Sequence, residues 1–508
     1  MSLAVLRSRA LNGMDAPAVS VEVHLAKGLP SFTIVGLPDT EVRESKDRVR
    51  AALANAGFKV PSRRVTVNLA PADLPKESGR FDLPIALGIL AASGQLPGNE
   101  LDQYEFAGEL SLSGELRPIR GALAMTFAMH KRGEASPRAF MLPSANADEA
   151  ALVAAAQIYP ADTLLQVCAH FSSGAGGDPA ARIGRHRSTP VGAALACADF
   201  AEVKGQLQAK RALEIAAAGA HNVLMVGPPG TGKTMLASRF TALLPPMTDA
   251  DALEAAAVQS LTRDFSVAHW KVRPYRSPHH TTSAVALVGG GTVPRPGEIS
   301  LAHCGVLFLD ELPEFDRRVL EVLRQPMESG TVTISRAASQ ADFPARFQLI
   351  AAMNPCPCGY LGHASGKCHC SSELVARYRH KISGPLLDRI DLQVDVATLS
   401  PLEVAAPAAG EASAVVAARV EQAYQRQLQR QGCSNQQLGP RQVDAFCQLD
   451  EAGARLLRET MLQWHWSARA YHRVLKVART IADLAGSERL SRAHVAEAIG
   501  YRRNVQER

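Results

Sequence analysis

The residues with the most specific chemistry form the run GPPGTGKT, which directly follows the apolar run VLMV. Glycines in such a loop let backbone N–H groups face a ligand, a lysine can reach the β- and γ-phosphates of a nucleotide, and a threonine hydroxyl can bind Mg²⁺. A strand, this loop and a helix that begins near Met235 form the arrangement that binds a nucleoside triphosphate at a helix N-terminus. The sequence therefore predicts an ATP site with Mg²⁺ at Thr234 and other contacts from Gly227, Pro228, Pro229, Gly230, Thr231, Gly232 and Lys233.

Two carboxylates follow the apolar run Val306 to Leu309. Asp310, at the end of a buried strand, can hold Mg²⁺, often through a water molecule. Glu311 can orient and deprotonate the water that attacks the γ-phosphate. An exposed acidic turn is the alternative, but an apolar strand that ends in Asp-Glu downstream of a phosphate loop favours a catalytic pair. The two residues extend the prediction from ATP binding to ATP hydrolysis.

Two further polar residues stand after predicted strands or turns. Asn354 follows the buried run Gln348 to Met353, where a polar side chain senses the γ-phosphate in P-loop ATPases of the AAA+ type; a residue that serves only a turn is the alternative. Arg389, in SGPLLDRIDL, fits a finger that reaches the γ-phosphate of a neighbouring subunit. A local ion pair with Asp388 or Asp391 is the alternative for this arginine. The predicted catalytic residues are Lys233, Glu311, Asn354 and Arg389.

Four cysteines stand close together after Asn354, in the run CPCGYLGHASGKCHC. Two pairs of thiols with a short loop between them can close a tetrahedral sulfur site, for which Zn²⁺ is the preferred metal. One residue separates the cysteines of each pair, which is tighter than the usual two, and His363 and His369 are alternative ligands. Free cysteines and redox-active thiols also stay open. The candidate zinc ligands are Cys356, Cys358, Cys368 and Cys370.

The length of 508 residues exceeds what one hydrophobic core usually holds and suggests about three domains. The formal net charge of +6 leans mildly toward anionic partners without requiring them. Nine cysteines, four of them clustered, favour reduced thiols with one metal cluster over a disulfide framework. No apolar run approaches the length of a membrane span, and Arg7, Arg9 and Asp15 interrupt any signal-peptide core. We therefore expect a cytoplasmic protein without a membrane partner.

The first 171 residues mix strand-like and helix-like runs, which predicts an α/β or α+β domain. The expected strands cover residues 19–24, 31–35 and 64–69, and the expected helices cover residues 41–56, 83–92 and 121–131.

Two segments of this region, LAPADLPKESGRFDLPIALGILAASG and FAGELSLSGELRPIRGALAMTFAMHKRG, resemble the Lon-protease-type domain. Arg80 stands where that pattern has the nucleophilic serine and Leu123 where it has the catalytic lysine, although Ser78 lies close by in the sequence. A serine–lysine mechanism needs both groups. The resemblance therefore implies a protease-like scaffold at residues 1–171 without protease activity.

The rest of the chain divides by composition. Residues 172–198 are rich in Gly, Ser, Pro and Arg and predict a flexible linker, whose basic residues could also touch a polyanion. Residues 199–399 hold the predicted nucleotide-binding core, which opens with an expected helix at 205–218, and the low-complexity residues 400–414 predict a loose connection. Residues 415–508 are helical in character, with expected helices at 415–431 and 467–485.

The C-terminal helices resemble the small lid that covers the nucleotide in AAA+ ATPases. Arg469, at the start of the longest expected helix, fits the second nucleotide sensor of such a lid. Arg473, one turn later, is its competitor, and both arginines could instead be surface charges.

Two segments of the core predict projecting hairpins. The run from Tyr275 to Ala302 contains three consecutive glycines and two prolines, which argue for a loop or hairpin and against a core helix. The run from Glu328 to Phe347 alternates apolar and polar residues around a turn. Arginines on these segments are candidates to hold phosphates of threaded DNA; they are Arg295, Arg336 and Arg346.

In order, a Lon-like region, GPPGTGKT, VLFLDEL, AAMNPCPCG, SGPLLDRIDL and SARAYHRVLKVARTIADL resemble the magnesium-chelatase-like AAA+ ATPases of the ComM (YifB) competence family. The resemblance implies a P-loop AAA+ core with a helical lid, in a bacterial homo-hexamer. It also implies an ATP-driven DNA helicase that promotes branch migration during homologous recombination in natural transformation, with recombination proteins as partners. A motor subunit of a magnesium chelatase and a protein-remodelling ATPase are the alternatives, although chelatase subunits lack the Lon-like region and need partner subunits.

Overall fold

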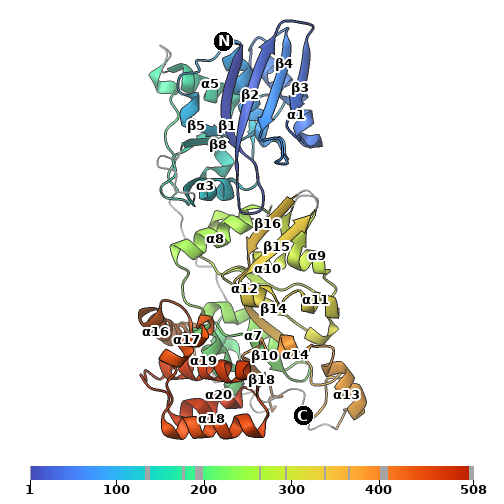
Figure 1. The fold of residues 1–508 in the computed structure, drawn as a ribbon, viewed down its shortest axis with the longest axis vertical. Coiled ribbons are helices and arrows are strands. Elements are labelled where there is room, and N and C mark those ends of the chain that lie inside the picture. Colours follow the sequence, from blue (N-terminus) through green and yellow to red (C-terminus); the bar gives the residue numbers. More distant parts are fainter. Residues whose placement is uncertain are drawn as a thin grey trace.

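The computed structural model describes residues 2–131, 138–173, 178–188, 198–262, 265–291, 294–336, 339–363, 366–400 and 410–502. The blue N-terminal sheet lies at one end of the long axis and the red C-terminal helices at the other (Figure 1). The yellow strands β15 (Thr331–Arg336) and β16 (Ser339–Pro344) lie nearer the N-terminal end than the green β10 (Val223–Val226) and α7 (Lys233–Arg239). Among the helices of the described ranges, none combines the length and the apolar character that crossing a membrane requires.

The N-terminal elements surround a seven-stranded mixed sheet in the order β3-β4-β2-β1-β5-β8-β9. Strand β2 pairs antiparallel with both β1 and β4, and the other neighbours pair parallel. Alternate residues of β2, such as Val19 and Val21, are buried, because successive side chains of a strand point to opposite faces. The strands are β1 (Leu3–Arg9), β2 (Ala18–Ala26), β3 (Ser31–Val35), β4 (Arg64–Ala70), β5 (Tyr104–Phe106), β8 (Ala139–Pro143) and β9 (Ile158–Ala161).

Helices cover this sheet. Helix α1 (Thr40–Asn55) begins where the Asp39 side chain accepts a hydrogen bond from the Val42 N–H, which satisfies a free donor of its first turn. Helix α2 (Asp82–Ala92) is buried on nearly every side, as its uniformly apolar sequence requires. The strands and helices expected before residue 131 are confirmed. The remaining elements are β6 (Glu109–Leu110), β7 (Leu116–Arg117), α3 (Ala122–Lys131), α4 (Ala147–Ala150) and α5 (Leu164–Ser173).

The central elements surround a five-stranded parallel sheet in the order β11-β14-β17-β10-β18. Its inner strands are apolar apart from Gln348 at the start of β17, because helices cover both faces of such a sheet. Strand β10 lies between β17 and β18, so the loop after β10 opens at the point where the strand order reverses, which is where parallel sheets bind ligands. The strands are β10 (Val223–Val226), β11 (Tyr275–Arg276), β14 (Val306–Leu309), β17 (Gln348–Met353) and β18 (Leu392–Asp395).

The helices of the central unit are short, and the α/β class expected for it is confirmed. They are α6 (Leu207–Gly219), α7 (Lys233–Arg239), α8 (Asp249–Ser260), α9 (Ala284–Val288), α10 (Glu298–Leu301), α11 (Arg317–Glu321), α12 (Pro326–Ser329), α13 (Ser372–Arg379) and α14 (Gly384–Leu387).

Both expected hairpins are present. The larger pairs β15 (Thr331–Arg336) with β16 (Ser339–Pro344), and the smaller pairs β12 (Gly289–Gly290) with β13 (Arg295–Pro296). Helices α9 and α10 flank the smaller hairpin because Leu287 and Ile299 are buried, so this segment is not wholly a loop. The two hairpins touch: a Cβ built on Gly289 would lie 2.8 Å from Ile334 Cδ1.

The larger hairpin and α8 pack against the N-terminal elements (Figure 1). The Asn12 side-chain amide donates to the Gln340 carbonyl at 3.3 Å, and the Gly121 N–H donates to the Ser260 carbonyl at 2.9 Å. Buried side chains of both regions belong to one hydrophobic cluster. The larger hairpin therefore contacts the N-terminal unit of its own chain.

Part of the expected linker also contacts that unit. His186 pairs with Ile158 of β9, and its ring lies 2.7 Å from Asp148. Arg182 forms an ion pair with Glu100 at 3.0 Å. These contacts hold Arg182 and His186 against the N-terminal unit, so this part of the expected linker is not a free tether. Residues 189–197, like residues 401–409 of the expected loose connection, lie outside the described ranges.

The C-terminal elements are helices that pack on α6 and the central sheet. The expected helices are confirmed, with α19 capped by the Ser467 hydroxyl and α16 ended by Gly432 in a left-handed conformation. Val474, Leu475 and Ile481 of α19 join the cluster that contains Val223 and Met225 of β10. The helices are α16 (Ser413–Gln431), α17 (Pro440–Phe446), α18 (Glu451–Gln463), α19 (Ala468–Leu484) and α20 (Arg492–Gly500).

Candidate nucleotide-binding site

The predicted phosphate loop joins β10 to α7 at the carboxyl edge of the central sheet. Gly230 and Gly232 have φ values of +77° and +88°, a left-handed conformation that glycine adopts without strain. A Cβ on Gly227 would lie 2.3 Å from the Val396 carbonyl oxygen, so only glycine fits there. Helix α7 begins at Lys233, two residues before the expected start near Met235, and its first N–H groups border the loop.

Lys233 is held inside the loop. Its Nζ donates to the carbonyl oxygens of Gly227 and Pro228 at 2.7 and 2.9 Å, and to Asn354 Oδ1 at 3.2 Å. Burial lowers the pKa of Lys233, while the nearby carboxylates of Asp310 and Glu311 raise it. The fold therefore brings together the lysine, the strand-end asparagine and both carboxylates, which lie far apart in the sequence.

Thr234 and Asp310 face one another at the mouth of the loop. The Thr234 hydroxyl donates to Asp310 Oδ2 at 2.6 Å, and Asp310 Oδ1 accepts from the Glu311 N–H at 2.9 Å. A hydroxyl and a carboxylate are the oxygen ligands that Mg²⁺ prefers beside substrate phosphates. These two residues therefore fit the ion that the loop sequence implies.

Glu311 stands in a left-handed conformation with φ +52°, which is uncommon outside glycine and recurs at functional sites. Its carboxylate is half exposed and lies 3.4 Å from His280 Nδ1. His280 in turn packs against His279, with 4.0 Å between ring centroids. The sequence analysis missed His280, because the run that contains it indicated only a projecting segment and gave no sign of which strand end it would reach.

Arg389 does not project into solvent. Its side chain is only 9% exposed, and it donates to Glu328 Oε1 at 2.5 Å and to the Pro385 carbonyl at 2.7 Å. The partner is neither Asp388 nor Asp391, the two acidic residues next to it in the sequence. Glu328 belongs to α12, which leads directly into the larger hairpin. Any contact of Arg389 with a neighbouring subunit therefore requires that this ion pair open.

The two candidate second sensors differ in their surroundings. Arg473 donates to Asp391 Oδ1 at 2.5 Å and to the Arg389 carbonyl at 3.1 Å. Although burial opposes ionisation, Arg473, His221 and the Asn222 N–H hold the pKa of Asp391 well below its usual range. Arg469, in the first turn of α19, is exposed. Arg473 is thus engaged in a network of hydrogen bonds around buried Asp391. Arg469, which is exposed, is the better candidate to contact a nucleotide.

Substitution should separate the two arginines. Arg473→Ala is expected to lower the free energy of unfolding by about 3 kcal/mol, because it removes one partner of a buried ion pair. Arg469→Ala is expected to change that free energy by no more than about 0.5 kcal/mol and to raise the KM for ATP. Chemical denaturation and steady-state kinetics on both variants measure this. An equal loss of stability in the two would contradict the assignment.

The four clustered cysteines come together directly after β17. Their Sγ atoms all lie within 4.8 Å of one another, and within the ranges that the structure describes the group contains no histidine. The alternative ligands His363 and His369 are therefore not part of it. Cys356 is buried, and the other three are at least partly exposed.

The arginines expected to meet DNA differ in their freedom. Arg346 forms ion pairs with Asp251 and Glu254 at 3.1 and 2.7 Å, so its charge is already neutralised. His303, assisted by Arg346, lowers the pKa of Glu254 to about 2. Arg295 is exposed on the smaller hairpin. The side chain of Arg336 lies outside the described part of the chain.

The residues at the protease-like positions do not form a nucleophile and base. Arg80 is buried, and its Nε donates to Ser78 Oγ at 2.8 Å. A guanidinium stays protonated in proteins and cannot take the proton of a serine hydroxyl. Leu123 is buried in the hydrophobic core.

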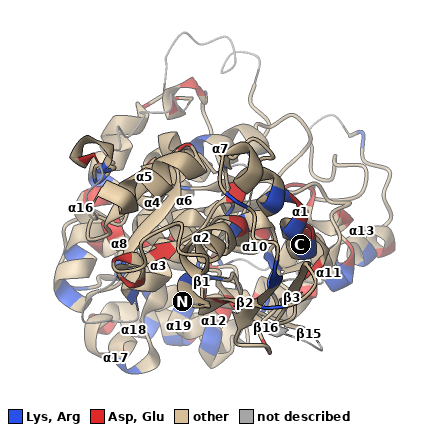
Figure 2. Ribbon diagram, turned by 90° about the horizontal axis from the view of Figure 1, so that it is seen from above, with Lys and Arg blue, Asp and Glu red and all other residues tan. Residues whose placement is uncertain are grey.

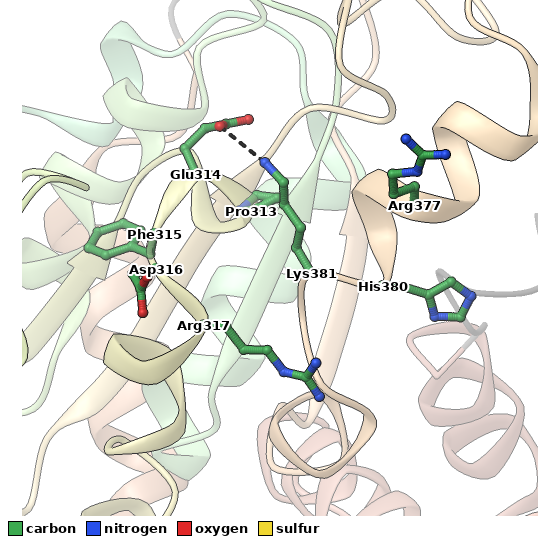
Figure 3. A pocket seen from close by; sticks show the side chains of 8 residues that line it. All are labelled: Pro313, Glu314, Phe315, Asp316, Arg317, Arg377, His380 and Lys381. Carbon is green, nitrogen blue, oxygen red and sulfur yellow. Dashed lines mark hydrogen bonds and ion pairs between the residues drawn. The ribbon is translucent and has the colours of Figure 1, made fainter.

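Two cavities lie near the carboxyl edge of the central sheet. One of about 1200 Å³ is lined by Gly227 and Pro228 of the phosphate loop, by Leu361 of the cysteine-rich segment and by Tyr501 after α20. The other, of about 480 Å³, is shown in Figure 3. It lies between the segment after Glu311 and the end of α13, where Lys381 is directed at Glu314 at 3.3 Å (Figure 3). No phosphate-loop residue lines this second cavity.

Charged residues are mixed over the molecule. Seen from above, Lys and Arg are interspersed with Asp and Glu (Figure 2). A basic stripe is the usual footprint of a nucleic-acid-binding face. This view gives no support of its own for a DNA-binding face, so the DNA-binding role proposed below rests on particular loops.

Comparisons with known proteins match three successive parts of the chain. Family models described as magnesium chelatase subunit ChlI, subunit ChlI of Mg-chelatase, and magnesium chelatase subunit ChlI C-terminal match residues 199–404, 21–146 and 410–502. Competence protein ComM of Haemophilus influenzae is 50% identical over 508 residues, which cover 100% of this chain and 98% of that protein. The uncharacterized protein YifB of Escherichia coli is 48% identical over 99% of this chain and 97% of its own length. The magnesium-chelatase 38 kDa subunit of Cereibacter sphaeroides is 30% identical over 174 residues, 31% of this chain and 52% of that subunit.

Proposed function

The chain belongs to the magnesium-chelatase-like AAA+ family that includes the ComM and YifB proteins, and from this premise we propose that it hydrolyses ATP to move DNA. The observation that carries the ATPase half is the meeting of Lys233, Thr234, Asp310 and Asn354 at one edge of the central sheet. The DNA half is supported by the relative named a competence protein, which is similar over the full length of the chain.

In the proposed site, N–H groups of the phosphate loop and Lys233 bind the phosphates of ATP. Thr234 and Asp310 would hold Mg²⁺, which would supply positive charge to neutralise the phosphate oxygens. Glu311 accepts the proton of the attacking water, and His280 keeps that carboxylate turned toward the site. Asn354, tied to Lys233, orients the same water. Arg469 on the C-terminal helices, which act as a lid, contacts the nucleotide from the other side.

We further propose that the site is completed by a second copy of the chain in a homo-hexamer. Arg389 of one subunit would leave Glu328 and stabilise charge on the phosphoryl group bound by its neighbour. Because Glu328 precedes β15, the opening of this ion pair would free the base of the larger hairpin. ATP hydrolysis would then be coupled to movement of the hairpins at residues 280–297 and 329–345.

The proposed work is helicase-driven branch migration of DNA during homologous recombination in natural transformation, in the cytoplasm and beside recombination proteins. Arg295 on the smaller hairpin is exposed and lies near the Glu77 carboxylate, and we propose that it contacts DNA phosphates with less rearrangement than Arg346, which would have to leave two carboxylates first. The protease-like domain at residues 1–171 would dock on the hairpins without cleaving peptides.

The proposed domain order continues after the protease-like domain. It comprises a linker at 172–198, part of which lies against the N-terminal unit, then the ATPase core at 199–399 with its cysteine-rich insert, a connection at 400–414 and a lid at 415–508.

A motor subunit of a magnesium chelatase is the second candidate, because the family models carry that description and one chelatase subunit is similar over part of the chain. A protein-remodelling ATPase is the third. Both alternatives predict an ATPase rate that does not respond to DNA. One assay therefore separates them from the DNA motor.

We expect single-stranded or forked DNA to raise the ATPase rate at low salt. Phosphate contacts release counterions, so a protein with six to ten of them loses about 1,000- to 100,000-fold in DNA affinity between 50 and 200 mM salt. The stimulation should therefore vanish over this range while the rate without DNA changes little. Steady-state ATPase assays with and without DNA, and DNA binding at each salt concentration, measure this. A rate indifferent to DNA, together with no salt-sensitive binding, would rule out the DNA motor.

A further inference from the structure

We propose that the four-cysteine cluster binds one Zn²⁺ ion and that the loaded site holds Asn354 and the phosphate loop in the arrangement that ATP binding requires. The second half of this proposal rests on the proposed ATPase function, and the first half stands without it. The evidence is the spacing of the thiols and the identity of the segments that they join.

The thiol spacing fits a tetrahedral metal site. The Sγ atom of Cys356 lies 3.3 Å from that of Cys358 and 3.8 Å from that of Cys368, and the Cys358 and Cys368 atoms are 3.6 Å apart. In a tetrahedron with Zn–S bonds of 2.3 Å, neighbouring sulfurs are about 3.8 Å apart. A disulfide would need about 2.05 Å. With Cys370, the set supplies four sulfur ligands, which is the number that a closed structural zinc site uses.

The cluster holds together the two ends of the cysteine-rich segment that connects β17 to α13. Cys356 stands two residues after Asn354, and Cys370 stands two residues before α13. At the far end of α13, Arg379 donates back to the Pro355 carbonyl at 3.4 Å. A metal at the cysteines would therefore close a ring through α13 and fix the residue next to Asn354 from both sides.

The same turn rests on the phosphate loop. Gly359, with φ +84°, donates its N–H to the Cys356 carbonyl at 2.9 Å. A Cβ on Gly359 would lie 2.6 Å from Pro229 Cδ and 3.8 Å from Asn354 Cγ. Because there is no space between this turn and the phosphate loop, a shift of the cysteine-rich segment must move one or both of Pro229 and Asn354.

The metal would thus act on ATP hydrolysis without touching the nucleotide. Asn354 accepts from Lys233 at 3.2 Å, so the position of the cysteine turn is transmitted to the ammonium that meets the phosphates. Displacement of a positioning group by about 1 Å can cost about 100-fold in rate. Loss of the metal is therefore expected to weaken ATP binding and to slow hydrolysis.

The test begins with metal content in the full-length chain, purified under reducing conditions. We expect near one zinc per chain by elemental analysis, lost in Cys368→Ser and in Cys370→Ser, both of which replace partly exposed thiols. Cys433→Ser is the matched control, because Cys433 is a partly exposed thiol outside the cluster, and it should retain the metal. No zinc in the wild-type protein, or equal zinc in Cys370→Ser, would overturn the metal site. This measurement uses neither nucleotide nor DNA, so its outcome is independent of the DNA-motor proposal.

The coupling is tested by binding of a fluorescent ATP analogue before and after removal of the metal with a chelator. Affinity should fall on removal and return when Zn²⁺ is restored, and the hydrolysis rate should follow it by about 100-fold. Gly359→Ala should weaken nucleotide binding, because a Cβ there would lie 2.6 Å from Pro229 Cδ and a φ of +84° strains a residue other than glycine; the zinc content of the same sample shows whether the cysteine turn is kept. Unchanged affinity in the zinc-depleted protein would overturn the coupling.

Discussion

Replacing Glu311 with Gln should lower kcat for ATP hydrolysis by about 100- to 10,000-fold, which is the usual contribution of a general base. The amide keeps the size and the hydrogen-bonding capacity of the side chain but cannot accept the proton of water. Lys233, Thr234 and Asp310 are untouched, so the dissociation constant for ATP should stay close to the wild-type value. Steady-state turnover and equilibrium binding of an ATP analogue measure the two quantities.

Glu314→Gln is the matched control for this variant. Glu314 lies three residues after Glu311 on the same turn, but it forms an exposed ion pair with Lys381 in the cavity of Figure 3. Surface ion pairs of this kind contribute little, so its turnover should stay near the wild-type rate. Unchanged turnover in Glu311→Gln would remove the assignment of Glu311 as the base.

The second large effect is expected from Arg389→Ala. An arginine finger supplied by a neighbouring subunit contributes about 1,000- to 100,000-fold to the rate of phosphoryl transfer. The variant should therefore bind ATP and fail to hydrolyse it. In the isolated chain this arginine is buried against Glu328, so its loss also leaves a carboxylate without its partner, and stability must be measured alongside turnover.

Mixed oligomers separate the two roles of Arg389. When Arg389→Ala subunits are mixed with Glu311→Gln subunits, an interface with an intact base on one side and an intact finger on the other should regain hydrolysis. Glu328→Gln is the companion variant: it breaks the same ion pair but keeps the arginine, and it should retain turnover. If the mixed oligomers do not recover hydrolysis, Arg389 acts within its own subunit and not at the site of a neighbour.

Local sequence was enough to predict the elements and the phosphate loop. Apolar runs such as Val223 to Val226 and Gln348 to Met353 appear as strands at those positions, because a strand buried on both faces needs unbroken apolar sequence. The loop glycines and Lys233 were predictable because their conformations and chemistry are set within eight consecutive residues. The cysteine cluster was visible for the same reason, since all four thiols lie within one short segment.

The partners of charged side chains were decided only by the tertiary structure. Arg389 meets Glu328, 61 residues away, instead of its acidic neighbours, and Arg473 meets Asp391, 82 residues away. His280 reaches Glu311 from a segment that the sequence indicated only as a hairpin. Packing of distant elements fixes these pairs, because a buried charge takes whichever opposite charge the fold brings within reach.

The sequence by itself determined that this protein has a strand-loop-helix for a nucleotide, two carboxylates at a strand end and four thiols beside an asparagine. Each of these patterns occupies a short stretch of the sequence. Only the tertiary structure decided that Lys233, Asn354, Thr234 and Asp310 meet at one edge, and that the thiol cluster rests on the phosphate loop. The physical reason is that the order β11-β14-β17-β10-β18 sets β10 beside β17, an arrangement that depends on long-range packing and not on local periodicity.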